Sequence, residues 1–181
     1  MLFISFGLDG EKTSVNFVRN SEQNFTRLAA MDAIDRKILI ELQRDATISV
    51  AELASRVGLS QTPCWKRVQR LEEDGVILKR VALVSPEHIG LGLTVFVSIE
   101  TGDHSMEWLT QFANFVAAQP EVMEVYRMAG DIDYVLRVTV ADMAAYDGFY
   151  KRLISGAQLK NVTSRFAMER IKAETSYPIA L

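Results

Sequence analysis

The stretch that decides the fold is residues 57–77, VGLSQTPCWKRVQRLEEDGVI. Gly58 predicts a tight turn, because glycine can adopt the left-handed conformation that follows a helix end. Ser60 is a preferred N-cap residue, and Pro63 is tolerated in the first turn of the helix that follows. That helix is expected to end near Gly75. Together with the helix before the turn, this pattern predicts a helix-turn-helix.

Two helices are expected before this helix. The first runs from Asp32 or Ala33 to Gln43, since apolar residues recur there at every fourth position. The second runs from Ser49 to Val57, and Ser49 with Glu52 predicts a capping box at its start.

Successive residues of a helix are about 100° apart around its axis, and this spacing gives the third helix two different sides. The apolar side, expected to face the core, carries Cys64, Val68 and Leu71; Cys64 is interpreted as a small buried residue rather than a redox site. The opposite side carries donors, cations and one aromatic ring: Thr62, Trp65, Lys66 and Gln69, flanked by Arg67 and Arg70. Such a face can enter the major groove of DNA, and a solvated basic face is the alternative.

Residues 76–84 are expected to form two short strands, with Lys79 and Arg80 near their turn. This hairpin is interpreted as a wing beside the DNA backbone; an ordinary hairpin leading into a linker is the alternative. Ser85-Pro86 interrupts regular structure and marks a domain end. The candidate DNA-binding residues are Ser60, Gln61, Thr62, Pro63, Trp65, Lys66, Arg67, Gln69, Arg70, Lys79 and Arg80.

From residue 91 the pattern alternates and then repeats a strand–helix–strand unit. Strands are expected over 91–99, 121–129, 134–140 and 161–172, and helices over 105–118 and 142–154. The order βαββαβ is the ferredoxin-like plan. The fold class is therefore α+β, a winged helix-turn-helix domain followed by a ferredoxin-like domain.

The predicted sheet has four antiparallel strands and both helices on one face. The aromatic residues of the helices are expected to be core rather than a cofactor site. Apolar residues such as Phe96 also lie on the other face of the first strand, so self-association through the sheet is expected.

Charge and composition restrict the function. The net charge of −3 argues against nucleic acid on its face, yet residues 32–80 carry nine basic and eight acidic side chains, whereas 81–181 carry eight and twelve. The single Cys64 excludes a disulfide framework, and with only His88 and His104 no metal site and no cofactor are expected. No nucleophile–base pair or phosphate loop is present, so the protein is not expected to be an enzyme.

The start of the chain has no recognisable export signal. Its apolar stretch lacks a preceding Lys or Arg, meets Asp9, and is too short to span a membrane. A cytoplasmic protein without membrane contact is expected. The expected domains are an N-terminal arm or upstream extension (1–31, with Met31 as the alternative start), the winged helix-turn-helix (32–84), a linker (85–90), the ferredoxin-like domain (91–175) and a C-terminal tail (176–181).

Five segments resemble the Lrp/AsnC, or feast/famine, transcription regulators. They are MDAIDRKIL (31–39), VGLSQTPC (57–64), RVQRLEEDGVI (67–77), GDIDY (130–134) and DMAAY (142–146). The resemblance covers about 32–175 and implies a DNA-binding regulator whose ferredoxin-like domain binds an effector and drives assembly. It implies homodimers that associate further, with an octamer expected, and an amino acid bound between dimers. Gln61, where the family often has proline, and Trp65 depart from the commonest pattern, so the operator sequence cannot be taken from relatives.

The effector residues that the resemblance implies are Met128, Gly130, Asp131, Asp133 and Tyr134, with Met143 and Phe166 added on position alone. Asp131 or Asp133 can accept the ammonium group of an amino acid, and turn amides can donate to its carboxylate. The alternative is that both aspartates bond their own turn. Two other functions stay open: a nucleoid-organising DNA-binding protein without an effector, and a haem-precursor decarboxylase of related build.

Overall fold

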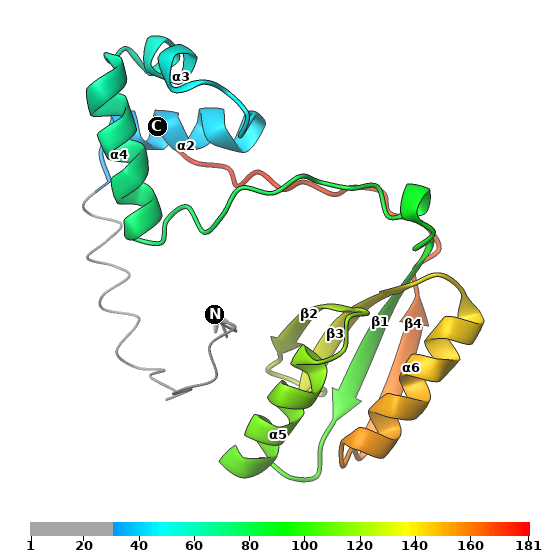
Figure 1. The fold of residues 1–181 in the computed structure, drawn as a ribbon. Helices are drawn as coiled ribbons and strands as arrows, with labels where there is room; N and C mark the ends of the chain where they lie inside the picture. Colours follow the sequence, from blue (N-terminus) through cyan, green and yellow to red (C-terminus); the bar gives the residue numbers. More distant parts are fainter. Residues whose placement is uncertain (1–30) are drawn as a thin grey trace. The chain divides into compact units, whose positions relative to one another are not determined.

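The computed structural model describes residues 31–181, which form two compact units (Figure 1). The first unit comprises residues 31–83 together with 172–181, and the second comprises residues 84–171. The described residues contain no candidate membrane-spanning helix. The alternatives for residues 1–30 lie outside the described residues.

The first unit contains the predicted helix-turn-helix. Its helices are α2 (Ala33–Arg44), α3 (Val50–Val57) and α4 (Gln61–Glu73). Gly58 follows α3 with a φ of 77°, the left-handed conformation expected from the sequence. The core between the helices is formed by Ile38, Leu39, Leu53, Ala54, Val57, Cys64, Val68 and Leu71.

Helix capping differs from the sequence prediction. The Ser49 hydroxyl accepts a bond from the Glu52 N–H, but the Glu52 carboxylate bonds to Arg56 rather than returning to Ser49. A complete capping box instead starts α2, where the Asp32 and Asp35 side chains each accept from the other's backbone N–H. The capping box predicted at Ser49 is therefore only half formed.

The prediction of two short strands over 76–84 is wrong, since no strand forms there. The Leu71 carbonyl accepts bonds from the N–H groups of Val76 and Ile77, and Gly75 has a φ of 69°, which closes the end of α4. Ile77 packs against the core, whereas Leu78 and most of the segment beyond it are exposed. A hairpin with no packed face is marginal in water.

The C-terminal residues 172–181 complete the first unit. Ile179 packs against its core. The Gln43 side chain, on α2, accepts from the Tyr177 N–H at 2.6 Å and donates to the Tyr177 carbonyl at 3.3 Å. The Ser176 hydroxyl donates to the Gln43 carbonyl. The tail is thus a packed part of the helix-turn-helix unit, a role the sequence did not indicate.

The second unit has the predicted βαββαβ order. Its elements are β1 (Leu93–Glu100), α5 (Met106–Ala117), β2 (Val122–Arg127), β3 (Tyr134–Val140), α6 (Met143–Gly156) and β4 (Asn161–Phe166), after a short 3-10 turn over Glu87–Ile89. The sheet order is β2-β3-β1-β4 and every pairing is antiparallel. The last strand ends at Phe166 rather than at residue 172.

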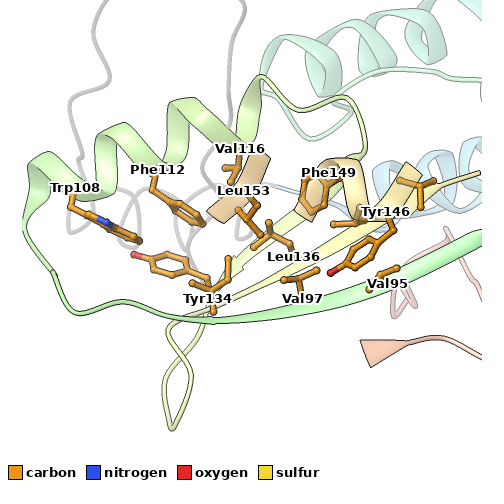
Figure 2. Packing of buried hydrophobic residues seen from close by; sticks show 13 residues of the cluster. Val95, Val97, Trp108, Phe112, Val116, Tyr134, Leu136, Tyr146, Phe149 and Leu153 are labelled. Carbon is orange, nitrogen blue, oxygen red and sulfur yellow. The ribbon is translucent and has the colours of Figure 1, made fainter. Parts of the chain in front are cut away.

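Both helices cover one face of this sheet. Figure 2 shows the side chains of α5 and α6 packed onto alternate residues of β1 and β3. Trp108 and Phe112 stack with ring centroids 4.9 Å apart, and Tyr134 contacts both rings. The prediction that the aromatic residues of the two helices are core is confirmed. Met143, at the start of α6, is 57% exposed.

The opposite face of the sheet carries polar and apolar groups together. Arg137 of β3 donates to Glu124 of β2 at 2.6 Å, and Arg165 of β4 donates to the Ser98 hydroxyl of β1. Phe96 on this face is exposed.

Candidate functional site

The recognition face of α4 is defined by Thr62, Trp65, Lys66 and Gln69. With a rotation of 100° per residue, these four residues fall within a sector of about 100° around the helix axis. Thr62, Trp65 and Lys66 are exposed and Gln69 is partly buried, while Cys64, Val68 and Leu71 are buried. The predicted division of α4 into a core side and an exposed polar side is confirmed.

Arg67 and Arg70 are bonded inside the protein. Arg67 Nη1 donates to the Asp32 carboxylate at 2.7 Å and to the Asp35 carboxylate at 2.8 Å, and Arg70 Nη2 donates to Asp35 at 2.6 Å. The Asp35 side chain is 1% exposed. The two arginines, which the sequence placed among the candidate DNA-binding residues, therefore join α4 to the start of α2.

The bonds of this ion-pair cluster also shift the pKa values of Asp32 and Arg67. The bond from the Asp35 backbone N–H, followed by the Arg67 guanidinium, lowers the pKa of Asp32 from 3.8 to about 2. Bonds to Asp35 and then Asp32 raise the pKa of Arg67. Both groups therefore stay ionised and paired across the ordinary pH range.

Glu72 engages two more of the predicted DNA-binding side chains. Arg80 forms an ion pair with Glu72 at 2.9 Å, and Gln69 donates to the same carboxylate at 3.1 Å. Lys66 and Lys79 are exposed and have no hydrogen-bond or ion-pair partner within residues 31–181. Lys66 is therefore the unpaired cation of the recognition face.

The N-terminus of α4 is left open. Ser60 occupies the N-cap position, as predicted, but its hydroxyl makes no capping bond. Ser60, Gln61, Thr62 and Pro63 are all exposed. The first N–H groups of a helix lack intrahelical partners and carry the positive end of its dipole, so this end can accept a phosphate.

The predicted effector residues include a tight turn between β2 and β3. Gly130 has a φ of 138°, and the Met128 N–H bonds to the Asp133 carbonyl at 2.8 Å. The Asp133 carboxylate accepts from the Thr101 N–H at 2.8 Å. Asp133 therefore fastens the turn to the end of β1, a contact that differs from the alternative of a bond within its own turn. Asp131 is exposed and is bonded to no residue within 31–181.

The sequence did not single out His104 as part of this turn. Its Nδ1 lies 3.9 Å from the second carboxylate oxygen of Asp133. The two residues are far apart in sequence, and their proximity follows from the pairing of β1 with β3.

One chain does not bring all seven predicted effector residues together. The ring of Tyr134 is buried in the core with Trp108 and Phe112. Phe166 pairs with Val95, and Met143 follows the end of β3, which is the opposite end of the sheet from the turn. The length of β3 separates the two ends by about 20 Å.

A separate pocket of about 1050 Å³ lies between the start of α5 and the end of α6. Its lining includes Asp103, Glu107, Gln111 and Lys160, but none of the predicted effector residues. Within residues 31–181 no group of three His, Cys, Asp or Glu side chains is arranged to hold a metal ion.

Two family patterns match the chain. A winged helix-turn-helix DNA-binding domain matches residues 31–77, and the Lrp/AsnC ligand binding domain matches residues 94–177. The chain is 55% identical over 150 residues to the DNA-binding transcriptional activator DecR of Escherichia coli K12, covering 82% of this chain and 99% of that protein.

Two solved structures are similar to the fold. An AsnC family transcriptional regulator from Agrobacterium tumefaciens is 57% identical, with a TM-score of 0.79 over 82% of this chain and 97% of the other. A transcriptional regulator of Neisseria meningitidis, in complex with L-methionine, is 34% identical, with a TM-score of 0.77 over 82% and 96%.

Proposed function

Because the chain belongs to the Lrp/AsnC family of transcription regulators, we propose that it binds double-stranded DNA through α4 and regulates transcription in response to a small effector. The observation that carries this proposal is the exposed recognition face of α4, with Lys66 unpaired and the helix N-terminus uncapped. These are the two features that meet phosphate and base edges in a helix-turn-helix complex.

In this proposal, side chains that bond to other residues of the chain have a different role from side chains that remain available to DNA. Ser60, Gln61 and Thr62 approach DNA from the open end of α4, with Pro63 beside them. Trp65 enters the groove, Lys66 and Lys79 meet the phosphate backbone, and Gln69 lies beside the groove while bonded to Glu72. Arg67, Arg70 and Arg80 hold the helix and the segment after it in place through their carboxylate partners.

Within residues 31–181, few cations on or beside the recognition face are unpaired, so affinity depends on several copies engaging DNA together. We propose that homodimers form through the open sheet face, where Phe96 is exposed, and that dimers assemble further, with an octamer expected. A homodimer then presents two helix-turn-helix units, one for each half-site of the DNA.

The proposed effector is an amino acid. The support is the L-methionine complex of the Neisseria meningitidis relative together with the exposed Asp131 beside the Gly130 turn. Asp131 is the ammonium acceptor, since Asp133 already accepts from Thr101. Met143 and Phe166 take part only from a neighbouring copy, because they lie at the other end of the sheet.

A salt titration tests DNA binding. The full chain is titrated with duplex DNA from upstream of its own gene at several salt concentrations. Affinity is expected to fall with a log–log slope of about −0.9 for each phosphate contact. Binding that does not depend on salt, or no binding, contradicts the proposal.

A thermal-shift panel of the twenty amino acids tests the effector. A ligand at about 100 times its Kd stabilises by roughly 2.7 kcal/mol. Asp131→Asn is expected to remove this shift while DNA binding stays, and Asp147→Asn, on the exposed side of α6, is the matched control. A panel without any shift refutes the amino-acid effector and favours an effector-independent DNA-binding protein.

A further inference from the structure

The two tryptophans of the chain have opposite environments. Trp108 is 6% exposed, and its indole N–H donates to the Gln158 carbonyl at 3.0 Å. Trp65 is 50% exposed, and its indole N–H has no partner within residues 31–181. The ring of Trp65 therefore contributes little to the core and presents a large apolar surface on the recognition face.

The neighbours of Trp65 limit which bases this face can recognise. Arginine recognises guanine by bonding to its O6 and N7 atoms. Arg67 and Arg70, the two arginines of α4, are bonded to Asp32 and Asp35 instead. The recognition face therefore has no unengaged guanidinium beside the Trp65 ring.

Major-groove chemistry then selects a partner for the ring. Base edges in this groove carry hydrogen-bond donors, acceptors and one apolar group, the C5-methyl of thymine. The face of the indole ring forms no hydrogen bonds, so its favourable contact in the groove is that methyl, while the indole N–H can donate to a neighbouring acceptor. The favourable partner of Trp65 is thus a thymine.

We propose that Trp65 is a specificity-determining residue that packs against the C5-methyl group of a thymine in each half-site. This inference rests on the proposed DNA-binding function and adds the base that α4 prefers. The ring excludes water from the methyl, while Lys66 provides the phosphate contact on the same helix face. Trp65 thereby contributes to sequence discrimination, and Lys66 contributes affinity for any sequence.

The test uses uracil, which differs from thymine only by lacking the methyl group. The full chain is first used to select a tight-binding duplex from a random pool. Each thymine of that duplex is then replaced by uracil in turn, and binding is measured at one salt concentration. Loss of a buried methyl, about 0.8 kcal/mol, corresponds to about fourfold weaker binding at the contacted thymine.

The decisive comparison repeats the measurement with Trp65→Ala. This variant is expected to bind the thymine and uracil duplexes equally at that position, with an unchanged melting temperature. Lys66→Ala is the matched control, and it is expected to keep the fourfold preference while its log–log salt slope falls by about 0.9. Thr62→Ser removes the other methyl on this face and is also expected to keep the preference.

Three results overturn the inference by itself. In the first, a duplex is selected but no thymine can be distinguished from uracil. In the second, Trp65→Ala keeps the preference, and in the third, Thr62→Ser abolishes it. If no duplex is enriched from the pool, the proposed DNA-binding function fails with it, so the two failures are distinguishable.

Discussion

Replacing Arg67 by alanine is expected to destabilise the first unit, whereas replacing its neighbour Lys66 is expected to weaken DNA binding alone. Both residues are cations on α4, and the sequence assigned them the same task. The structure separates them, since Arg67 bonds to two carboxylates at 2.7 and 2.8 Å and Lys66 has no partner within residues 31–181.

The size of the effect follows from the contacts. Asp35 is 1% exposed but keeps Arg70 and the Asp32 N–H as partners after the substitution, so it is not left unpaired. Loss of a hydrogen bond to a charged group costs about 1.5–3 kcal/mol. A loss of about 2 kcal/mol lowers the melting temperature of a unit of this size by about 8–16 °C.

The assay is thermal unfolding of both variants followed by circular dichroism, together with the salt dependence of DNA binding. The free energy of unfolding of Lys66→Ala is expected to stay within about 0.5 kcal/mol of that of the original chain, since the change alters an exposed, unpaired side chain. Its log–log slope is expected to fall by about 0.9. The reasoning is refuted if Arg67→Ala melts at the original temperature and loses the salt dependence instead.

Three further predictions concern stability. Gly156→Ala is expected to lower the free energy of unfolding by about 1–3 kcal/mol in urea unfolding, because the added Cβ would overlap the Phe115 ring. Gly148→Ala on the same helix, with 3.8 Å to its nearest neighbour, is the control expected to lose no stability. The free energy of unfolding is expected to fall as the pH drops from about 4 towards 2. The pKa of Asp32 is lowered from 3.8 to about 2 in the folded chain, so the unfolded chain takes up the proton first. Asp32→Asn should reduce this dependence of stability on pH over the same range. Removal of residues 176–181 is expected to lower the melting temperature of the first unit, because the Ile179 packing and the Gln43 bonds are lost; an unchanged melting temperature would contradict this role.

Local and periodic features could be predicted from the sequence. The helix bounds, the Gly58 turn, the βαββαβ order and the buried stripes follow from residue spacing and backbone preference, which act over a few residues. For the same reason the apolar side of α4 was predicted correctly.

The candidate site was harder to predict than the fold. The prediction of two strands over 76–84 failed because a run of apolar residues alone does not supply a packed face. Met143 and Phe166 were assigned to the effector turn by position, but the antiparallel register carries them to the other end of the sheet.

The sequence by itself therefore determined the two domain types, the recognition helix and the turn between β2 and β3, since each has a local signature. Only the tertiary structure decided which polar groups are still available for a ligand. Arg67 and Arg70 meet Asp35 across more than thirty residues of chain, Asp133 meets Thr101 across a strand pair, and the C-terminal residues return to Gln43. Those partners are set by the packing of distant segments, and a charge that is paired in the fold has to exchange that partner before it binds DNA or an effector.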